Sequence, residues 1–285
     1  MDLTQQIDHR LPDGRNLAYA AWGPAGPTIF HHHGTGSSRF EAAALARAAE
    51  GLPLRVIGID RPGCGASTQD PRRDFHSFQA DVEHLADSLG IERYCASGVS
   101  GGAAFACGAA LSPRAVKVYP LNMPPDLGSA AGRLIPFSLR FMIWLTIRPA
   151  VFRRAARRAA LNPLGRTEQS NMPDIDKRVL LQEIPDIWTA AITEGTRLGT
   201  DGVARDTQLL RKSWGLDWNR MVAPVEVRQG LLDPFLPFPR ALAKIQPGVS
   251  LIEFEGGHVA ALGRSVLRGV AEAAAQLMRR APSGQ

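Results

Sequence analysis

Three times in its first half, this chain has a short apolar run, then a glycine-rich turn, then a segment whose apolar residues have the spacing of a helix. This pattern constrains its fold more than any other feature of the sequence. Strands that alternate with helices are typical of a mostly parallel sheet, because parallel neighbours need a crossover that a helix supplies. The sequence therefore predicts an α/β protein whose doubly wound sheet is covered by helices on both faces. The strands are expected at 27–32, 54–59 and 93–99, and the helices at 41–49, 75–89 and 101–111.

The rest of the chain extends this pattern and interrupts it once. A turn at Asp13-Gly14 separates two short alternating runs, which indicates an antiparallel hairpin at the edge of the sheet. Between residues 129 and 221 helical patterns predominate without a clear strand, so we expect a helical cap there. Residues 1–128 and 222–285 would form the core, with eight strands and the cap inserted before the last two. Further strands are expected at 116–122, 224–229 and 250–255, and a helix at 264–280.

Composition and charge favour an ordinary globular protein acting on a small molecule. Of the 285 residues, 45% are hydrophobic and 21% are charged, and the formal net charge is +6. The basic residues are scattered, which argues against a nucleic-acid partner, except for four arginines along one side of a predicted helix. These four are either a solvated surface or a site for an anionic substrate tail or an acidic partner. They are Arg153, Arg154, Arg157 and Arg158.

The sequence shows neither a secretion signal nor a membrane span. Its first residues lack a basic leader followed by an apolar region. The longest apolar stretch, Leu134 to Ile147, is interrupted by Arg140 and is shorter than the roughly 20 residues that cross a bilayer. Three cysteines lack the paired spacing of a zinc or redox motif. We therefore expect a cytoplasmic protein, and a homodimer is compatible with the sequence.

A candidate nucleophile lies at Gly98-Val99-Ser100-Gly101-Gly102, which matches the GxSxG pattern between a predicted strand and a predicted helix. Glycines on both sides leave room for a strained turn that directs the serine hydroxyl away from the sheet. The motif alone also fits a chance glycine-rich turn. Because a serine nucleophile needs a base that is oriented by a third group, a histidine and an acid are expected later in the chain.

The later part of the chain supplies both groups in the order Ser, Asp, His. His258 is the candidate base, because it follows the last predicted strand and precedes the last helix. Asp233 follows the preceding strand and would accept the Nδ1 proton of His258. It also fits a turn before Pro234, and Asp126 is the competing acid.

Acyl transfer also needs hydrogen-bond donors for the negative oxygen of the tetrahedral intermediate. The expected donors of this oxyanion hole are the backbone N–H groups of Gly101 and of Thr35, which lies in the loop after strand 27–32. Gly34 of the same loop is expected to contact the substrate. The three consecutive histidines 31–33 alternate between faces of a strand, so they cannot converge on one metal ion. Neither a metal nor a cofactor is expected.

Five segments of the chain, in their order along the sequence, resemble the α/β-hydrolase superfamily. The resemblance is to cap-bearing bacterial members in particular, similar to proline iminopeptidases and small esterases. They read HHHGTGSSR, GIDRPGCGAS, SGVSGGAAFA, QGLLDPFLP and EGGH. The resemblance implies the α/β-hydrolase fold and a serine hydrolase that cleaves a carboxylic ester or thioester of a small, largely apolar substrate through an acyl-enzyme on Ser100. Relatives with an aspartate nucleophile do not match this serine, and the absence of an HGGPG loop counts against peptidase activity. Arg61 is expected to hold the DRPG loop.

Two alternatives to ester hydrolysis stay open at this point. A carbon–carbon bond hydrolase or lyase can use the same triad, and some relatives keep it as ligand-binding proteins with negligible turnover. Large side chains of the cap would line an apolar pocket over Ser100, although packing among cap helices explains the same residues and is the more common role of such side chains. They are Phe137, Phe141, Met142, Trp144, Trp188 and Trp214, of which Phe141, Trp144 and Trp188 are the candidates for substrate contact.

Overall fold

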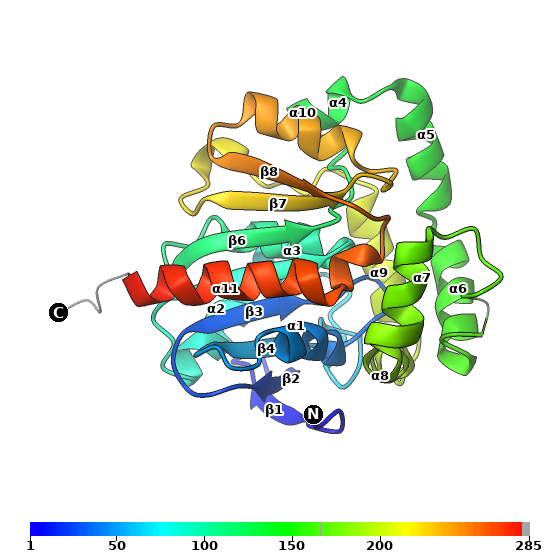
Figure 1. Ribbon diagram of the computed structural model, residues 1–285. Helices are drawn as coiled ribbons and strands as arrows, with labels where there is room; N and C mark the ends of the chain where they lie inside the picture. Colours follow the sequence, from blue (N-terminus) through cyan, green and yellow to red (C-terminus); the bar gives the residue numbers. More distant parts are fainter. Residues whose placement is uncertain (166, 281–285) are drawn as a thin grey trace.

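The computed structural model describes residues 1–165 and 167–280, and an eight-stranded sheet lies at its centre (Figure 1). The strand order is β1-β2-β4-β3-β5-β6-β7-β8. The first two strands form the expected edge hairpin, β2 pairs antiparallel with β4, and the remaining strands pair parallel to one another. The strands are β1 Ile7–Arg10, β2 Asn16–Trp22, β3 Thr28–His32, β4 Arg55–Ile59, β5 Tyr94–Val99, β6 Ala115–Leu121, β7 Val225–Gly230 and β8 Val249–Phe254.

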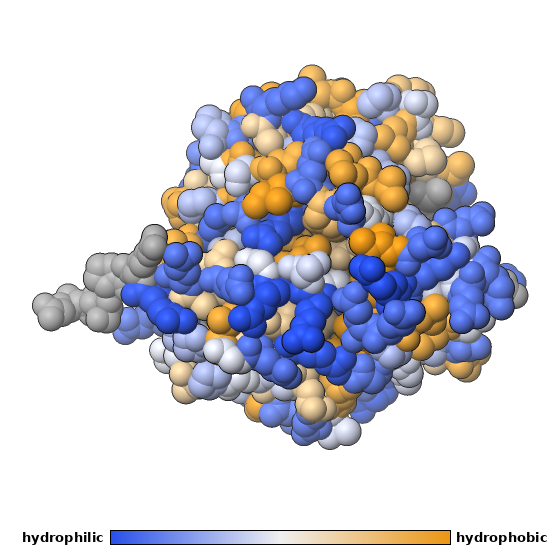
Figure 2. All heavy atoms as spheres, in the orientation of Figure 1, coloured by the Kyte–Doolittle hydropathy of each residue, from blue (hydrophilic) through white to orange (hydrophobic). Residues whose placement is uncertain are grey.

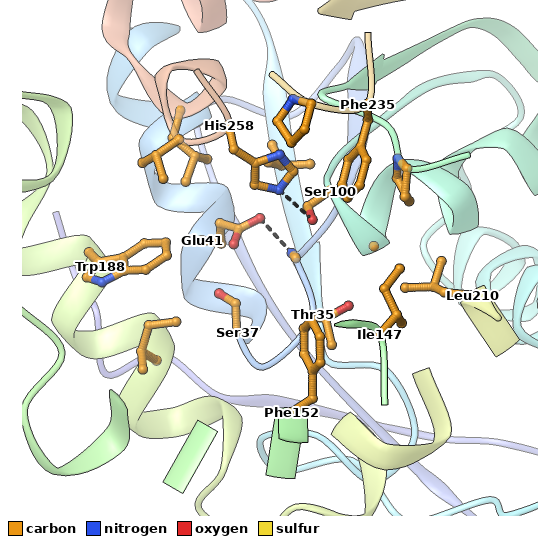
Figure 3. Close-up of a pocket in the computed structure, with 18 residues that line it drawn as sticks. Thr35, Ser37, Glu41, Ser100, Ile147, Phe152, Trp188, Leu210, Phe235 and His258 are labelled. Atoms are coloured by element: carbon orange, nitrogen blue, oxygen red, sulfur yellow. Dashed lines mark hydrogen bonds between the residues drawn. The ribbon is translucent and has the colours of Figure 1, made fainter. Parts of the chain in front are cut away.

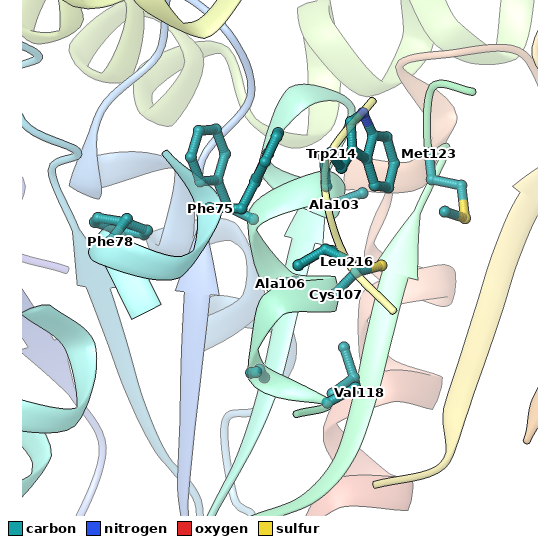
Figure 4. Close-up of a cluster of buried hydrophobic side chains, with 14 of the residues drawn as sticks. Phe75, Phe78, Ala103, Ala106, Cys107, Val118, Met123, Trp214 and Leu216 are labelled. Atoms are coloured by element: carbon teal, nitrogen blue, oxygen red, sulfur yellow. The ribbon is translucent and has the colours of Figure 1, made fainter. Parts of the chain in front are cut away.

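Helices cover both faces of the sheet, and central strands such as β3 and β5 are therefore buried at every residue. Neighbouring residues of β3 show this: Ile29 belongs to the core under one helix layer and Phe30 to the core under the other. The first layer consists of α1 (Ala42–Ala48) and α11 (Arg264–Arg280). The second consists of α2 (Phe75–Ser88), α3 (Gly101–Ala109) and α10 (Pro237–Ile245), and its larger, aromatic-rich core is drawn in Figure 4.

The segment between β6 and β7 contains helices and connecting turns but no strand in the part that the structure describes. Its helices α5 to α9 lie beyond the carboxyl ends of the parallel strands, where the arrowheads point in Figure 1. A π-helical turn at Val179–Glu183 joins α7 to α8. The helices are α4 Ala130–Leu134, α5 Phe137–Thr146, α6 Pro149–Leu161, α7 Asp174–Arg178, α8 Pro185–Gly195 and α9 Asp201–Leu210. Among the described residues, no helix is long and apolar enough to cross a membrane.

The predicted fold class is confirmed, with one helix that the sequence analysis missed. The six predicted core strands begin and end within one residue of the observed bounds. Helix α10 was not predicted, because three prolines around residues 234–239 obscured its pattern. Pro237 stands in the first turn of that helix, where proline is tolerated since its missing N–H would have no partner there. A crossover is required at this point because the adjacent strands β7 and β8 run parallel, and a helix is the usual form of such a crossover.

Candidate active site

Ser100 occupies the sharp turn between β5 and α3. Its backbone is left-handed, with φ of 55° and ψ of −124°, a region that residues other than glycine rarely adopt. The turn is this tight because its neighbours lack side chains: a Cβ on Gly102 would overlap the carbonyl oxygen of His32, and a Cβ on Gly98 would overlap the carbonyl oxygen of Gly102. The serine hydroxyl is thereby held above the carboxyl end of the sheet.

A continuous chain of hydrogen bonds joins Ser100, His258 and Asp233. The Oγ of Ser100 lies 2.8 Å from Nε2 of His258, and Nδ1 of the same ring lies 2.7 Å from Oδ2 of Asp233. The carboxylate side chain of Asp233 is completely buried, and its Oδ1 accepts the N–H of Phe235 at 2.8 Å. The ring of Phe235 packs edge-on against the imidazole at 5.5 Å. With Nδ1 protonated toward the buried carboxylate, Nε2 is free to accept the serine proton.

The competing acid, Asp126, has other partners. Its Oδ1 accepts the backbone N–H groups of Gly128 at 3.1 Å and of Trp214 at 3.4 Å. Burial raises the pKa of its carboxyl group. Asp126 therefore joins two loops of the chain, whereas Asp233 is the carboxylate that contacts His258.

The loop that carries His258 is held by two residues that the sequence analysis did not single out. Asn122, at the end of β6, donates from Nδ2 to the carbonyl oxygens of Gly257 and His258 at 2.9 and 2.7 Å. From α7, the buried Asp176 accepts the N–H of Gly257 at 2.8 Å and that of Val259 at 3.0 Å. The core and the inserted helices thus position the imidazole together. Only tertiary contacts identify these two residues, since neither belongs to a motif.

The two expected oxyanion donors lie side by side next to Ser100. Gly101 is the first residue of α3, where backbone N–H groups have no partner within the helix. Thr35 packs so closely that a Cβ on Gly101 would overlap its Oγ1. Among the described residues, neither N–H has a hydrogen-bond acceptor, and both residues line the cavity above the serine.

Glu41 and Arg61 both form hydrogen bonds with the loop around Thr35. Oε1 of the buried Glu41 accepts the N–H of Gly34 at 2.9 Å, a role that no motif had indicated. Arg61 donates to the carbonyl oxygens of His33 and Gly34 at 2.5 and 3.2 Å. The expectation that Arg61 holds the DRPG loop is therefore incomplete, because its guanidinium also braces this neighbouring loop.

The three consecutive histidines are buried and have separate environments. Nδ1 of His31 lies 2.9 Å from the hydroxyl of Ser97, and Nδ1 of His33 lies 2.8 Å from the carbonyl oxygen of Gly34. Burial, together with the positive charges of Arg61 and His31, lowers the pKa of His32 to about 3. Burial likewise lowers the pKa of His33. Within residues 1–165 and 167–280, no cluster of His, Cys, Asp and Glu side chains could hold a metal ion.

A cavity of about 370 Å³ opens above Ser100, between the sheet and the inserted helices (Figure 3). Of the candidates for substrate contact, Gly34 and Trp188 line it. Phe141 and Trp144 do not: they are 51% and 43% exposed, because α5 turns its other face inward. Most of the wall is apolar and includes side chains that the sequence analysis missed. These are Ile147, Phe152, Ile192, Leu210 and Leu262.

Comparisons with known proteins agree with this architecture. A model of the alpha/beta hydrolase family matches residues 29–273. The chain is 37% identical over 84 residues to a bifunctional esterase/perhydrolase from Acinetobacter calcoaceticus, a match covering 28% of this chain and 30% of that protein.

Two solved structures share the fold at low sequence identity. A structure from a study of carboxylesterases of Nitrososphaera gargenis has a TM-score of 0.69 and 14% identity, over 96% of this chain and 100% of that one. Epoxide hydrolase A from Mycobacterium thermoresistibile has a TM-score of 0.68 and 21% identity, over 97% and 99%. The two neighbours differ in chemistry, so the fold alone does not decide the reaction. With the family model matching most of its length, this chain belongs to the alpha/beta hydrolase family.

Proposed function

We propose that this protein is a serine hydrolase that cleaves a carboxylic ester or thioester of a small, largely apolar substrate. The observation that carries the proposal is the hydrogen-bonded chain of Ser100, His258 and Asp233 at the floor of an apolar cavity. A serine hydroxyl becomes a useful nucleophile when a neighbouring imidazole accepts its proton. The partial match to an esterase/perhydrolase supports the same class of reaction.

In the proposed mechanism, Ser100 Oγ attacks the carbonyl carbon of the substrate while its proton passes to Nε2 of His258. Asp233 stabilises the resulting imidazolium and keeps its ring in place. The tetrahedral intermediate collapses when His258 returns the proton to the leaving oxygen or sulfur, which leaves an acyl group on Ser100. Water then attacks this acyl group with His258 again accepting a proton, and the acid product and the free serine are released.

The backbone N–H groups of Thr35 and Gly101 would donate to the negative oxygen of both tetrahedral intermediates. Their proximity to Ser100 and their lack of other acceptors among the described residues support this role. Donors that are already oriented cost little reorganisation during the reaction, and losing one typically slows an enzyme by about 10² to 10³. Glu41 and Arg61, which brace the loop, would act as positioning residues.

We further propose that residues 129–221 serve as a cap on a core formed by 1–128 and 222–285. Side chains on both sides of these boundaries line the same cavity: Phe152 and Trp188 belong to the inserted segment, and Phe235 to the core. The cap would select substrates by size and apolarity, since few polar groups face the cavity. A cytoplasmic location remains part of the proposal.

The experiment that tests the proposal is labelling with a fluorophosphonate, followed by mass spectrometry of the intact protein. We expect one adduct on the wild-type protein, none on Ser100→Ala, and a burst of product from 4-nitrophenyl acetate whose size equals the enzyme concentration.

Three outcomes would contradict it. Labelling of Ser100→Ala to the same extent would place the nucleophile elsewhere. A correctly folded wild-type protein that neither labels nor turns over esters, but binds apolar ligands, would favour a ligand-binding protein. Turnover of a carbon–carbon substrate without an acyl-enzyme burst would favour the hydrolase or lyase alternative.

A further inference from the structure

One segment of the inserted helices concentrates positive charge without a single acidic residue. Between Asp126 and Glu168 the sequence contains eight arginines and neither aspartate nor glutamate. Because the whole chain carries +6, the remaining residues together carry a net charge of −2. The basic character of the protein therefore comes from this segment, which includes α5 and α6.

The same segment exposes an unusual amount of apolar surface. Of the fifteen exposed large hydrophobic side chains among the described residues, eight lie between Leu134 and Leu161. Helix α5 buries Ile143 and turns five large side chains outward instead of the polar face that a surface helix normally presents. These are Phe137, Phe141, Met142, Trp144 and Leu145, with exposed fractions of 78%, 51%, 46%, 43% and 42%.

The aromatic side chains of α5 form a ridge that is bordered by cations. Phe137 stacks on Phe141 at 6.3 Å between ring centroids, and Phe141 stacks on Trp144 at 6.2 Å. The guanidinium groups of Arg148 and Arg211 lie over the ring of Trp144 at 5.7 and 4.5 Å. Beside the ridge, a groove of about 320 Å³ combines these aromatics with Arg140 and Lys212. Apolar contact and positive charge are thus available within one groove.

Helix α6 continues the positive surface toward the other end of the segment. Arg153 forms a salt bridge with Asp201 at 2.6 Å, but the salt bridges among the described residues include none of Arg154, Arg157 or Arg158. Both helices lie at the same end of the molecule (Figure 1). In the space-filling view, hydrophobic atoms gather over α5 (Figure 2). We call this surface the α5–α6 face: the five outward side chains of α5 together with Arg140, Arg148, Arg154, Arg157 and Arg158.

We propose that the α5–α6 face docks on a bilayer that contains anionic phospholipids. Guanidinium groups bind phosphate through paired hydrogen bonds, and aromatic side chains favour the boundary between headgroups and acyl chains. A helix with an outward apolar ridge flanked by arginines has the chemistry of an interfacial anchor, not of a membrane span. A second copy of this chain is disfavoured as the occupant, because two such faces would oppose their own positive charges.

The position of this face relates it to the cavity above Ser100. Ile147 follows α5 and Phe152 lies in α6, and both side chains line that cavity. A molecule docked through the α5–α6 face would therefore hold the wall of its cavity at the bilayer surface. The docking itself is independent of the proposed catalytic chemistry, so it can be tested without a substrate.

The test is co-sedimentation of the full chain with vesicles of phosphatidylcholine alone or with about one third phosphatidylglycerol. We expect binding to the anionic vesicles that weakens as NaCl is raised to about 0.5 M, because salt screens the arginine–phosphate attraction. Substituting Arg154, Arg157 and Arg158 together by Gln should weaken binding about 100-fold, at about fivefold per arginine. Phe137→Ser combined with Phe141→Ser should reduce binding both before NaCl is added and at about 0.5 M NaCl, because apolar contact is not screened by salt.

Matched controls replace similar exposed side chains elsewhere. Two control variants should bind like the wild type. One changes Arg10, Arg72 and Arg264 together to Gln, and the other combines Leu198→Ser with Leu232→Ser. Circular dichroism verifies the folding of every variant. The proposal would be overturned if the wild-type protein bound neutral and anionic vesicles equally or bound neither. It would also be overturned if the variants of the α5–α6 face bound anionic vesicles as well as the wild type does. If sedimentation velocity shows a dimer, and if Phe137→Ser combined with Phe141→Ser dissociates it, the face binds a second copy instead.

Discussion

The backbone at Ser100 is left-handed because several neighbouring positions have no side chain. Gly98 and Gly102 lie on either side, and each faces a carbonyl oxygen at a distance that leaves no space for a Cβ. Gly108, six residues further along α3, has no such restriction, since a Cβ there would meet the carbonyl oxygen of Phe75 at an ordinary 3.5 Å. One helix therefore contains both a required and a replaceable glycine.

Gly102→Ala should lower the free energy of unfolding by about 1 to 3 kcal/mol, and it should reduce esterase activity, because the added methyl must displace the backbone of His32. Gly108→Ala should instead stabilise the protein by about 0.5 to 1 kcal/mol, since alanine favours a helix over glycine. Urea unfolding measures both changes. Equal effects of the two substitutions would contradict the steric account of the turn.

Single residues differ in how well the sequence predicts them. Ser100, Asp233 and His258 follow from a motif, a position after successive strands and a fixed chain order, and the structure brings them within hydrogen-bonding distance. Asn122 and Asp176 have no such signal. Their side chains hold the His258 loop through contacts between segments far apart in sequence, which become visible only in three dimensions.

At the scale of elements, α9 is joined to the core by a buried group of charges. Asp206 of this helix pairs with Arg61 at 2.7 Å and with Arg73 at 2.5 Å, and all three side chains are inaccessible to solvent. Arg61 in turn holds the loop before α1, so α9 and the loop with the expected oxyanion donor share one anchor. Removing the shared carboxylate would leave two buried guanidinium groups without their partner.

Asp206→Ala should lower the free energy of unfolding by about 3 to 5 kcal/mol, the usual cost of breaking a buried ion pair from one side. The matched control is Asp201→Ala in the same helix, whose pair with Arg153 is on the surface and should contribute at most about 1 kcal/mol. Urea denaturation with a constant m-value provides the comparison. A cost for Asp206→Ala as small as that for Asp201→Ala would show that the buried pairs do not anchor α9.

The sequence predicts elements well where their periodicity is regular and poorly where it is not. Each core strand is a short apolar run between turn residues, and the predicted bounds agree with the structure within one residue. The prolines around α10 hid that helix. In α5 apolar residues occupy almost every position, so no pattern indicated that Phe141 and Trp144 would face outward.

For the whole molecule, the cavity is a product of its topology. Ser100 follows β5, Asp233 and His258 lie in the loops after β7 and β8, and the helices between β6 and β7 cover the cavity. Parallel strands end at one edge, so residues separated by more than 150 positions meet there. Under the proposed function, the side chains of these helices would set how much room an acyl group has.

Phe152→Ala should shift the preferred acyl chain of 4-nitrophenyl esters toward greater length, because the phenyl ring occupies part of the wall. Each additional methylene that becomes buried should contribute about 0.8 kcal/mol, or about fourfold in kcat/KM. Phe141→Ala is the control, since that ring lies outside the cavity and its chain-length profile should stay unchanged. Identical profiles for Phe152→Ala and the wild type would exclude Phe152 from the acyl-binding wall.

The ion pairs of the inserted helices are distributed unevenly. Glu194 of α8 contacts the buried Arg39 at 2.7 Å, and Asp206 of α9 contacts Arg61, so both helices are bound to the core. Among the described residues, no salt bridge joins α5 or α6 to the core, and the salt bridge of α6 links its Arg153 to Asp201 of α9. The inserted helices are therefore attached in two ways: buried ion pairs fix α8 and α9 to the core, whereas Ile143 of α5 and Phe152 of α6 pack against its apolar side chains. The attachment of α5 and α6 to the core consequently depends on apolar burial.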